Sequence, residues 1–121
     1  MGKHGKPHDI VERSAAFADR CIQVALHLPK NAVGGEIGRQ ITRSGGSVGA
    51  NVEEAQAADS RTDFSRRMKI ALREARESRF WLSRIKNNRL ISAQRLTGLI
   101  QESEEIVAIL TTIVRKTRPA E

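Results

Sequence analysis

The chain has 121 residues, the size of one domain with one core, and its single cysteine excludes an internal disulfide. Three Phe, one Trp and no Tyr are too few for a module that stacks nucleic-acid bases on exposed aromatic rings. The formal net charge is +7, and residues 59–91 carry ten basic against four acidic residues, or +6, so an acidic partner is expected to dock there.

Residues 1–8 contain two Gly and one Pro and are expected to form a flexible N-terminus. Their basic residues precede no apolar run, so they do not resemble a signal peptide. No stretch of the chain is apolar for long enough to span a membrane. We therefore expect a cytoplasmic protein with no membrane partner.

A first helix is predicted over residues 9–28, with Asp9 as its N-cap and Pro29 as its stop. Its apolar stripe includes Phe17 and either Cys21 or Ile22, and a cysteine on such a stripe is typical of a small buried side chain.

A second helix is predicted over residues 34–58 and contains six of the nine glycines. Gly38, Gly45 and Gly49 fall together beside its apolar stripe, which permits close approach by a neighbouring helix. The Gly45-Gly46 pair could instead divide the segment, but the apolar period continues in phase and favours one helix. Asn51, near this stripe, is a candidate for a buried polar group that fixes the register between helices.

A third helix is predicted over residues 62–88, with Ser60 or Thr62 as its cap, and a fourth over residues 92–116, with Ser92 as its cap. Residues 118–121 form a tail. Each segment has one apolar stripe, the connections are short and no segment alternates with period two. The sequence therefore predicts an all-α fold, an antiparallel up-down-up-down four-helix bundle over residues 9–117.

Five cations of the third helix project to the side opposite its apolar stripe. They are Arg66, Lys69, Arg73, Arg76 and Arg84. One interpretation is a solvated face that maintains solubility. The other is a surface that binds RNA or DNA through its phosphates.

Ile70 and Trp81 share a line outside the core side of the third helix, and Phe80 lies within the basic side. Because Trp often anchors interfaces, these three residues are the predicted surface for self-association. The alternative is that Trp81 is buried within its own subunit. Phe80 also favours a second hypothesis, a protein-interaction scaffold with no nucleic-acid role.

The sequence offers no catalytic constellation. The Glu residues of the second and third helices lack the Glu-x-x-His pairs of di-iron bundles and are expected to pair with Arg39, Arg43 or Arg73. We predict no metal site, no cofactor and no enzymatic activity.

Two stretches resemble a known family. They are Ser47-Val48-Gly49-Ala50-Asn51-Val52-Glu53-Glu54-Ala55, and Ala71 to Ser78 followed by Trp81-Leu82. With Asp63-Phe64 and the Leu28-Pro29 turn, they are similar to the small bacterial four-helix-bundle proteins found in intervening sequences of large-subunit (23S) ribosomal RNA genes. The resemblance covers about residues 9–115, and the chain departs from it at Ala55, where a glycine is frequent.

The resemblance implies an antiparallel bundle that assembles as a homopentamer and has no established enzymatic activity. It also implies a distant relation to the accessory variability protein of retroelements, a basic pentamer that works with a reverse transcriptase and nucleic acid. It supplies no residues for a substrate site.

Overall fold

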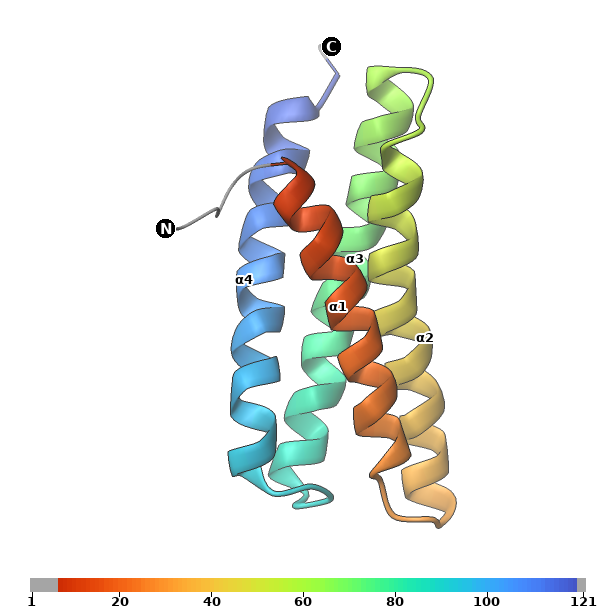
Figure 1. The fold of residues 1–121 in the computed structure, drawn as a ribbon, viewed down its shortest axis with the longest axis vertical. Coiled ribbons are helices and arrows are strands. Elements are labelled where there is room, and N and C mark those ends of the chain that lie inside the picture. The colour runs from red at the N-terminus through yellow and green to blue at the C-terminus, as the bar shows by residue number, and fades with distance from the viewer. Residues whose placement is uncertain (1–6, 120–121) are drawn as a thin grey trace.

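A computed structural model of the chain describes residues 7–119, with side chains described from residue 10 onward. It contains four α-helices (Figure 1), which are α1 Pro7–Leu26, α2 Ala32–Ala55, α3 Arg61–Asn87 and α4 Ala93–Thr117. Consecutive helices run in opposite directions and pack side by side, and α1 meets α4 over a smaller interface. The predicted all-α, up-down-up-down bundle is confirmed, and no strand occurs within residues 7–119.

Helix α1 begins two residues before its predicted start. Proline is well suited to the first helical position because its missing N–H would have no intrahelical acceptor there. The helix therefore begins at Pro7, and Asp9 lies inside its first turn rather than at its cap. The predicted flexible segment 1–8 thus overlaps the helix at its last two residues, while residues 1–6 lie outside the described part of the chain.

The ends of α2 also differ from the prediction. Asn31 caps the helix, and its Oδ1 accepts the Gly34 N–H at 2.8 Å, so the helix begins at Ala32. At the other end the amides of Gln56, Ala57 and Ala58 each donate to the carbonyl three residues earlier. These shorter-range hydrogen bonds replace the α-helical pattern, so the helix ends at Ala55.

The predicted cap of α3 is observed, since the Ser60 hydroxyl accepts the Asp63 N–H at 3.0 Å. Ser92 occupies the cap position of α4 as predicted, but its side chain makes no cap hydrogen bond. Between these helices Arg89 adopts a φ of 56°, the left-handed conformation that reverses the chain after α3. Arg118 and Pro119 follow α4 as a tail, and residues 120–121 lie outside the described range.

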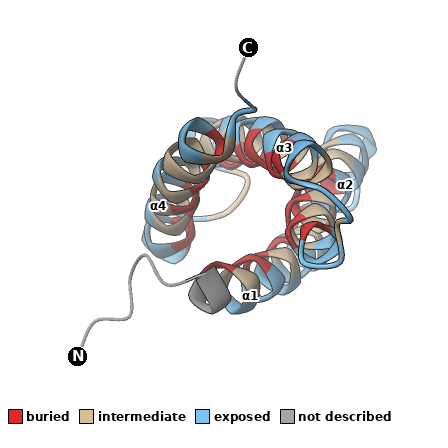
Figure 2. Ribbon diagram, turned by 90° about the horizontal axis from the view of Figure 1, so that it is seen from above, coloured by how far each residue is buried: buried red, intermediate tan, exposed pale blue. Residues whose placement is uncertain are grey.

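The core is formed by one stripe from each helix (Figure 2), and it buries Phe17, Ile41, Leu82 and Leu110 completely. Cys21 is buried and Ile22 is not, which decides between the two candidates for the α1 stripe. Five serines share this core: Ser14, Ser44, Ser65, Ser78 and Ser103. The hydroxyl group of such a short side chain can donate a hydrogen bond to a nearby backbone carbonyl. Ser103 Oγ, for example, donates to the Ile100 carbonyl oxygen at 2.6 Å.

Glycines set the distance between α1 and α2. A Cβ added at Gly45 would lie 2.6 Å from both Cβ and Sγ of Cys21, and one at Gly49 would lie 3.1 Å from the Ser14 carbonyl oxygen. The backbones can approach this closely only because these residues have no side chain. The predicted close approach is confirmed, and so is the single continuous helix through Gly45-Gly46.

Substitutions at two adjacent glycines test this packing. Gly45→Ala should lower the free energy of unfolding by about 1–3 kcal/mol, because the new methyl group overlaps Cys21. Gly46→Ala is the matched control: its Cβ meets nothing within 4 Å, so the better helix propensity should raise stability by about 0.5–1 kcal/mol. Urea unfolding followed by circular dichroism measures both, and equal stability of the two variants would contradict the packing argument.

Candidate nucleic-acid interface

The outer side of α3 carries a row of exposed cations. Arg66, Lys69, Arg73 and Arg76 are exposed, while the opposite side of the helix buries its apolar stripe in the core. The predicted basic residues therefore lie on one solvent-facing surface, here called the α3 face and defined by these four cations together with Phe80 and Arg84.

Most of these cations have no carboxylate of their own subunit beside them. Arg66 pairs with Asp63 one turn earlier at 2.6 Å, an exposed contact of the kind that contributes little to stability. Within the described residues no carboxylate lies within ion-pair distance of Lys69, Arg73 or Arg76. The positive charge of this surface is thus largely available to an external partner.

The side chain of Arg84 has different surroundings from the four exposed cations of the α3 face. Its guanidinium carbon lies 5.3 Å from the centre of the Phe80 ring, in cation–π geometry, and the residue is half-buried. Its Nε is buried and has no hydrogen-bond partner among the described residues. The sequence projection placed Arg84 on the correct side but could not indicate that Phe80 would partly cover it.

The three residues predicted for self-association are not equally accessible. Phe80 is 51% exposed and meets the Trp81 ring edge-on, with centroids 5.1 Å apart. Trp81 is half-buried, packs against the core of its own subunit and donates its indole N–H to Glu77 Oε2 at 3.0 Å. Ile70 is also half-buried. Phe80 is therefore the most accessible member, and much of Trp81 is covered within the subunit.

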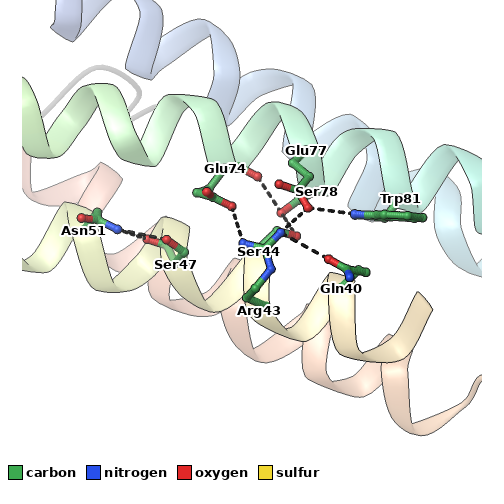
Figure 3. A network of polar contacts seen from close by, with 9 residues as sticks. All are labelled: Gln40, Arg43, Ser44, Ser47, Asn51, Glu74, Glu77, Ser78 and Trp81. Atoms are coloured by element: carbon green, nitrogen blue, oxygen red, sulfur yellow. Dashed lines mark hydrogen bonds and ion pairs between the residues drawn. The ribbon is translucent and has the colours of Figure 1, made fainter. Parts of the chain in front are cut away.

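Polar residues join α2 to α3 beside Trp81 (Figure 3). Arg43 of α2 pairs with both Glu74, at 3.1 Å, and Glu77. The expected pairing of these glutamates with arginine is thus observed at Arg43, whereas Arg39 pairs with Glu36 at 2.8 Å. Hydrogen bonding from the Trp81 N–H, aided by Arg43, lowers the pKa of Glu77 against the opposing effect of burial.

Asn51 does not have the predicted role in register. Its amide Nδ2 donates to the Ser47 carbonyl at 2.9 Å and to Ser47 Oγ at 3.0 Å, both in its own helix (Figure 3). The buried polar contact between α2 and α3 is instead the hydrogen bond from Ser78 Oγ to Ser44 Oγ, at 2.9 Å. Ser44 and Ser78 both fall on the apolar stripes of their helices, and this position is the only signal in the sequence for the contact.

One cross-helix contact was not predicted. Arg13 of α1 donates from Nε and Nη2 to Glu102 of α4, at 3.0 and 2.7 Å, and from Nη2 to Glu105 at 2.7 Å. Hydrogen bonding to Glu102 raises the Arg13 pKa above its usual value. This fork joins the two helices whose interface is smallest.

Among the described residues we find neither a metal-binding cluster nor an activated nucleophile. No group of three or more His, Cys, Asp or Glu side chains among them is arranged to hold a metal ion. Burial raises the pKa of Cys21 to about 12, so the thiol stays protonated and is not a nucleophile. Across residues 7–119 no helix is long and apolar enough to cross a membrane.

Trp81, the only tryptophan, should report the protonation of Glu77. Because the folded-state pKa of Glu77 is lowered, its contribution to stability is present above the ordinary glutamate pKa and is lost as the pH falls through the lowered value. The Trp81 emission should therefore titrate with a midpoint below the ordinary glutamate value of about 4.3. Arg43→Ala should move this midpoint upward, and Glu77→Gln should abolish the transition. An unchanged transition in Glu77→Gln would show that another group is responsible.

Comparison with known proteins identifies the family to which this chain belongs. The profile of the family described as 23S rRNA-intervening sequence protein matches residues 6–112. A solved structure from Bacteroides thetaiotaomicron, described as a protein of unknown function from the S23 ribosomal protein family, is 32% identical, with a TM-score of 0.83. The match covers 90% of this chain and 97% of that one. No curated protein matches the chain. The chain belongs to the family of 23S rRNA-intervening sequence proteins.

Proposed function

We propose that this protein is a non-enzymatic, cytoplasmic nucleic-acid-binding protein that contacts RNA or DNA through the α3 face. The observation that carries the proposal is the row of Lys69, Arg73 and Arg76, exposed and without a counter-carboxylate among the described residues. Clustered cations of this kind bind phosphates through counterion release.

The spacing of the cations suits a phosphate backbone. Lys69 and Arg76 are seven residues apart, or about 10 Å along the helix axis. Phosphates of one strand follow each other at about 3.4 Å of axial rise, so this segment reaches about three of them. The face has one exposed aromatic ring and no array of rings, which favours binding that depends little on sequence.

Family membership supports this proposal only by analogy. The family is named for the position of its genes within ribosomal RNA, and the solved relative is described as having unknown function. Neither description assigns a ligand, so the argument depends on the charges of this chain.

The salt dependence of binding tests the proposal. Binding of single-stranded RNA should weaken steeply with salt, because each phosphate contact contributes about 0.7 to the slope of log affinity against log salt. The triple variant Lys69→Ala, Arg73→Ala, Arg76→Ala should lower that slope by about 2, in fluorescence anisotropy titrations at several salt concentrations.

A matched control variant removes three positive charges, the same number, from a surface outside the α3 face. Arg115→Ala, Lys116→Ala and Arg118→Ala neutralise three exposed cations at the end of α4 and should leave the slope close to the wild-type value. Equal slopes for wild type and the α3 triple variant, or an equal loss in the control, would rule out the α3 face as the nucleic-acid site.

A second candidate function is a protein-interaction scaffold, and the exposure of Phe80 favours it. A large apolar ring among cations adds nothing to a phosphate contact but can anchor a protein interface. The partner could be further copies of this chain, assembled as the homopentamer that the family resemblance implies. Binding to phosphates should tolerate Phe80→Ala, whereas assembly should not.

A further inference from the structure

The ring of Phe80 lies between two cations of the α3 face. Arg76 comes four residues before it and Arg84 four residues after it, so each of these residues is about 6 Å from it along the helix axis. All four aromatic residues of the chain lie in the described part, and Phe80 is the only one of them that is exposed. A partner that binds these cations therefore also meets a flat apolar ring.

Neighbouring side chains hold this ring in one orientation. The Arg84 guanidinium carbon lies over it, 5.3 Å from its centre, and Trp81 meets it edge-on with centroids 5.1 Å apart. Trp81 is itself fixed by its hydrogen bond to Glu77 (Figure 3). Phe80 nevertheless remains 51% exposed, so the ring keeps free surface for one more flat partner. A side chain that is already oriented loses little conformational freedom on binding.

The charges around the ring favour a partner with phosphate groups. Glu74 and Glu77 precede Phe80 on α3, but both are paired with Arg43. Within the described side chains, no carboxylate is within ion-pair distance of Arg76 or Arg84, and the buried Nε of Arg84 has no hydrogen-bond partner. Phosphates can therefore approach the ring from both sides along the helix.

A hollow of about 370 Å³ extends from Arg76 toward the start of α3. The four exposed cations of the α3 face surround it, and Ile70 and Leu72 contribute apolar lining. Cations at the rim can hold phosphates while the apolar lining contacts the sugars between them. One strand can thus run along α3 through this hollow and over Phe80.

We infer that the α3 face recognises single-stranded nucleic acid by stacking one unpaired base on Phe80, while Arg76 and Arg84 hold the phosphates on either side of that base. This inference rests on the proposed function and adds the class of nucleic acid. In a duplex, neighbouring base pairs cover the flat face of each base, so the α3 face can reach only the backbone. An unpaired base exposes its flat face and can stack on an aromatic ring.

A single ring is compatible with the composition of the chain. Four aromatic residues cannot supply the row of rings on which successive bases stack, but one ring takes one base. Because every base has such a flat face, stacking on Phe80 adds affinity without selecting a sequence. Contacts to phosphates alone do not need the ring, which makes Phe80 the residue that distinguishes unpaired nucleotides from a duplex.

Two oligomers with equal numbers of phosphates isolate the contribution of the base. One is a short oligothymidine and the other is its abasic counterpart, each labelled for fluorescence anisotropy at one low salt concentration. Wild type should bind the oligothymidine at least about fivefold more tightly than the abasic oligomer, which is the lower end of what stacking on one ring contributes. Phe80→Ala should remove this preference, and Phe80→Tyr, which retains a ring, should keep it.

Two further variants and a duplex serve as controls. Phe80→Leu keeps an apolar side chain beside Trp81 without a flat ring, so it should lose the preference as Phe80→Ala does. Leu26→Ala removes an exposed apolar side chain of α1 and should keep it. Phe80→Ala should weaken binding of a duplex far less than binding of the oligothymidine. Circular dichroism should show the helix content of wild type in every variant, because both positions are exposed.

The outcomes separate this inference from the proposed function. Salt-dependent binding in which wild type has no preference for the oligothymidine would overturn the inference alone. A preference that survives in Phe80→Ala or in Phe80→Leu would do the same, and would leave the ring to a protein partner. No binding of any of the three nucleic acids would overturn both the inference and the proposed function.

Discussion

The close contact between α1 and α2 is the constraint on which the rest of the architecture depends. Gly45 against Cys21 and Gly49 against the Ser14 backbone bring the two helices closer than side chains would allow. Each glycine inside a helix costs about 0.5–1 kcal/mol relative to alanine, so this approach must be offset by better packing of the core. The same contact leaves a floor of small residues on the outside, and so it links the interior of the bundle to its surface.

The charged side chains of the bundle fall into two groups: those that form an ion pair within the subunit and those that do not. Arg13 and Arg43 are satisfied across helix interfaces, by Glu102 and Glu105 and by Glu74 and Glu77. Lys69, Arg73 and Arg76 have no such partner among the described residues, and neither have Asp19, Glu53 and Glu54. The bundle thus separates the charges that stabilise it from those that it presents outward. Both candidate functions proposed above depend on these unpaired cations of α3, whose partner would be a polyanion or an acidic protein surface.

Much of the fold could be predicted from the sequence, because apolar periodicity reports which side of a helix is buried. The stripes, the Ser60 cap and the position of the basic residues all follow from local spacing. What could not be predicted depends on contacts between helices. Periodicity alone does not indicate that Arg13 meets Glu102, that Asn51 bonds within its own helix, or that Trp81 is held by Glu77. Helices α1 and α2 each begin two residues before the predicted start, because Pro7 suits the first helical position and Asn31 caps α2, whereas the ends of α3 and α4 differ from the prediction by one residue.

The central claim is that the α3 face is a binding surface rather than a solubilising one. Hydroxyl-radical footprinting of Phe80 tests it most directly, because the exposed ring is oxidised unless a partner covers it. Oxidation of Phe80 is compared in nucleic-acid-free protein at low and high concentration, and again after addition of RNA. The account predicts that oxidation of Phe80 falls when RNA is added or when the protein concentration rises. Unchanged oxidation of Phe80 at high concentration and after addition of RNA would contradict it.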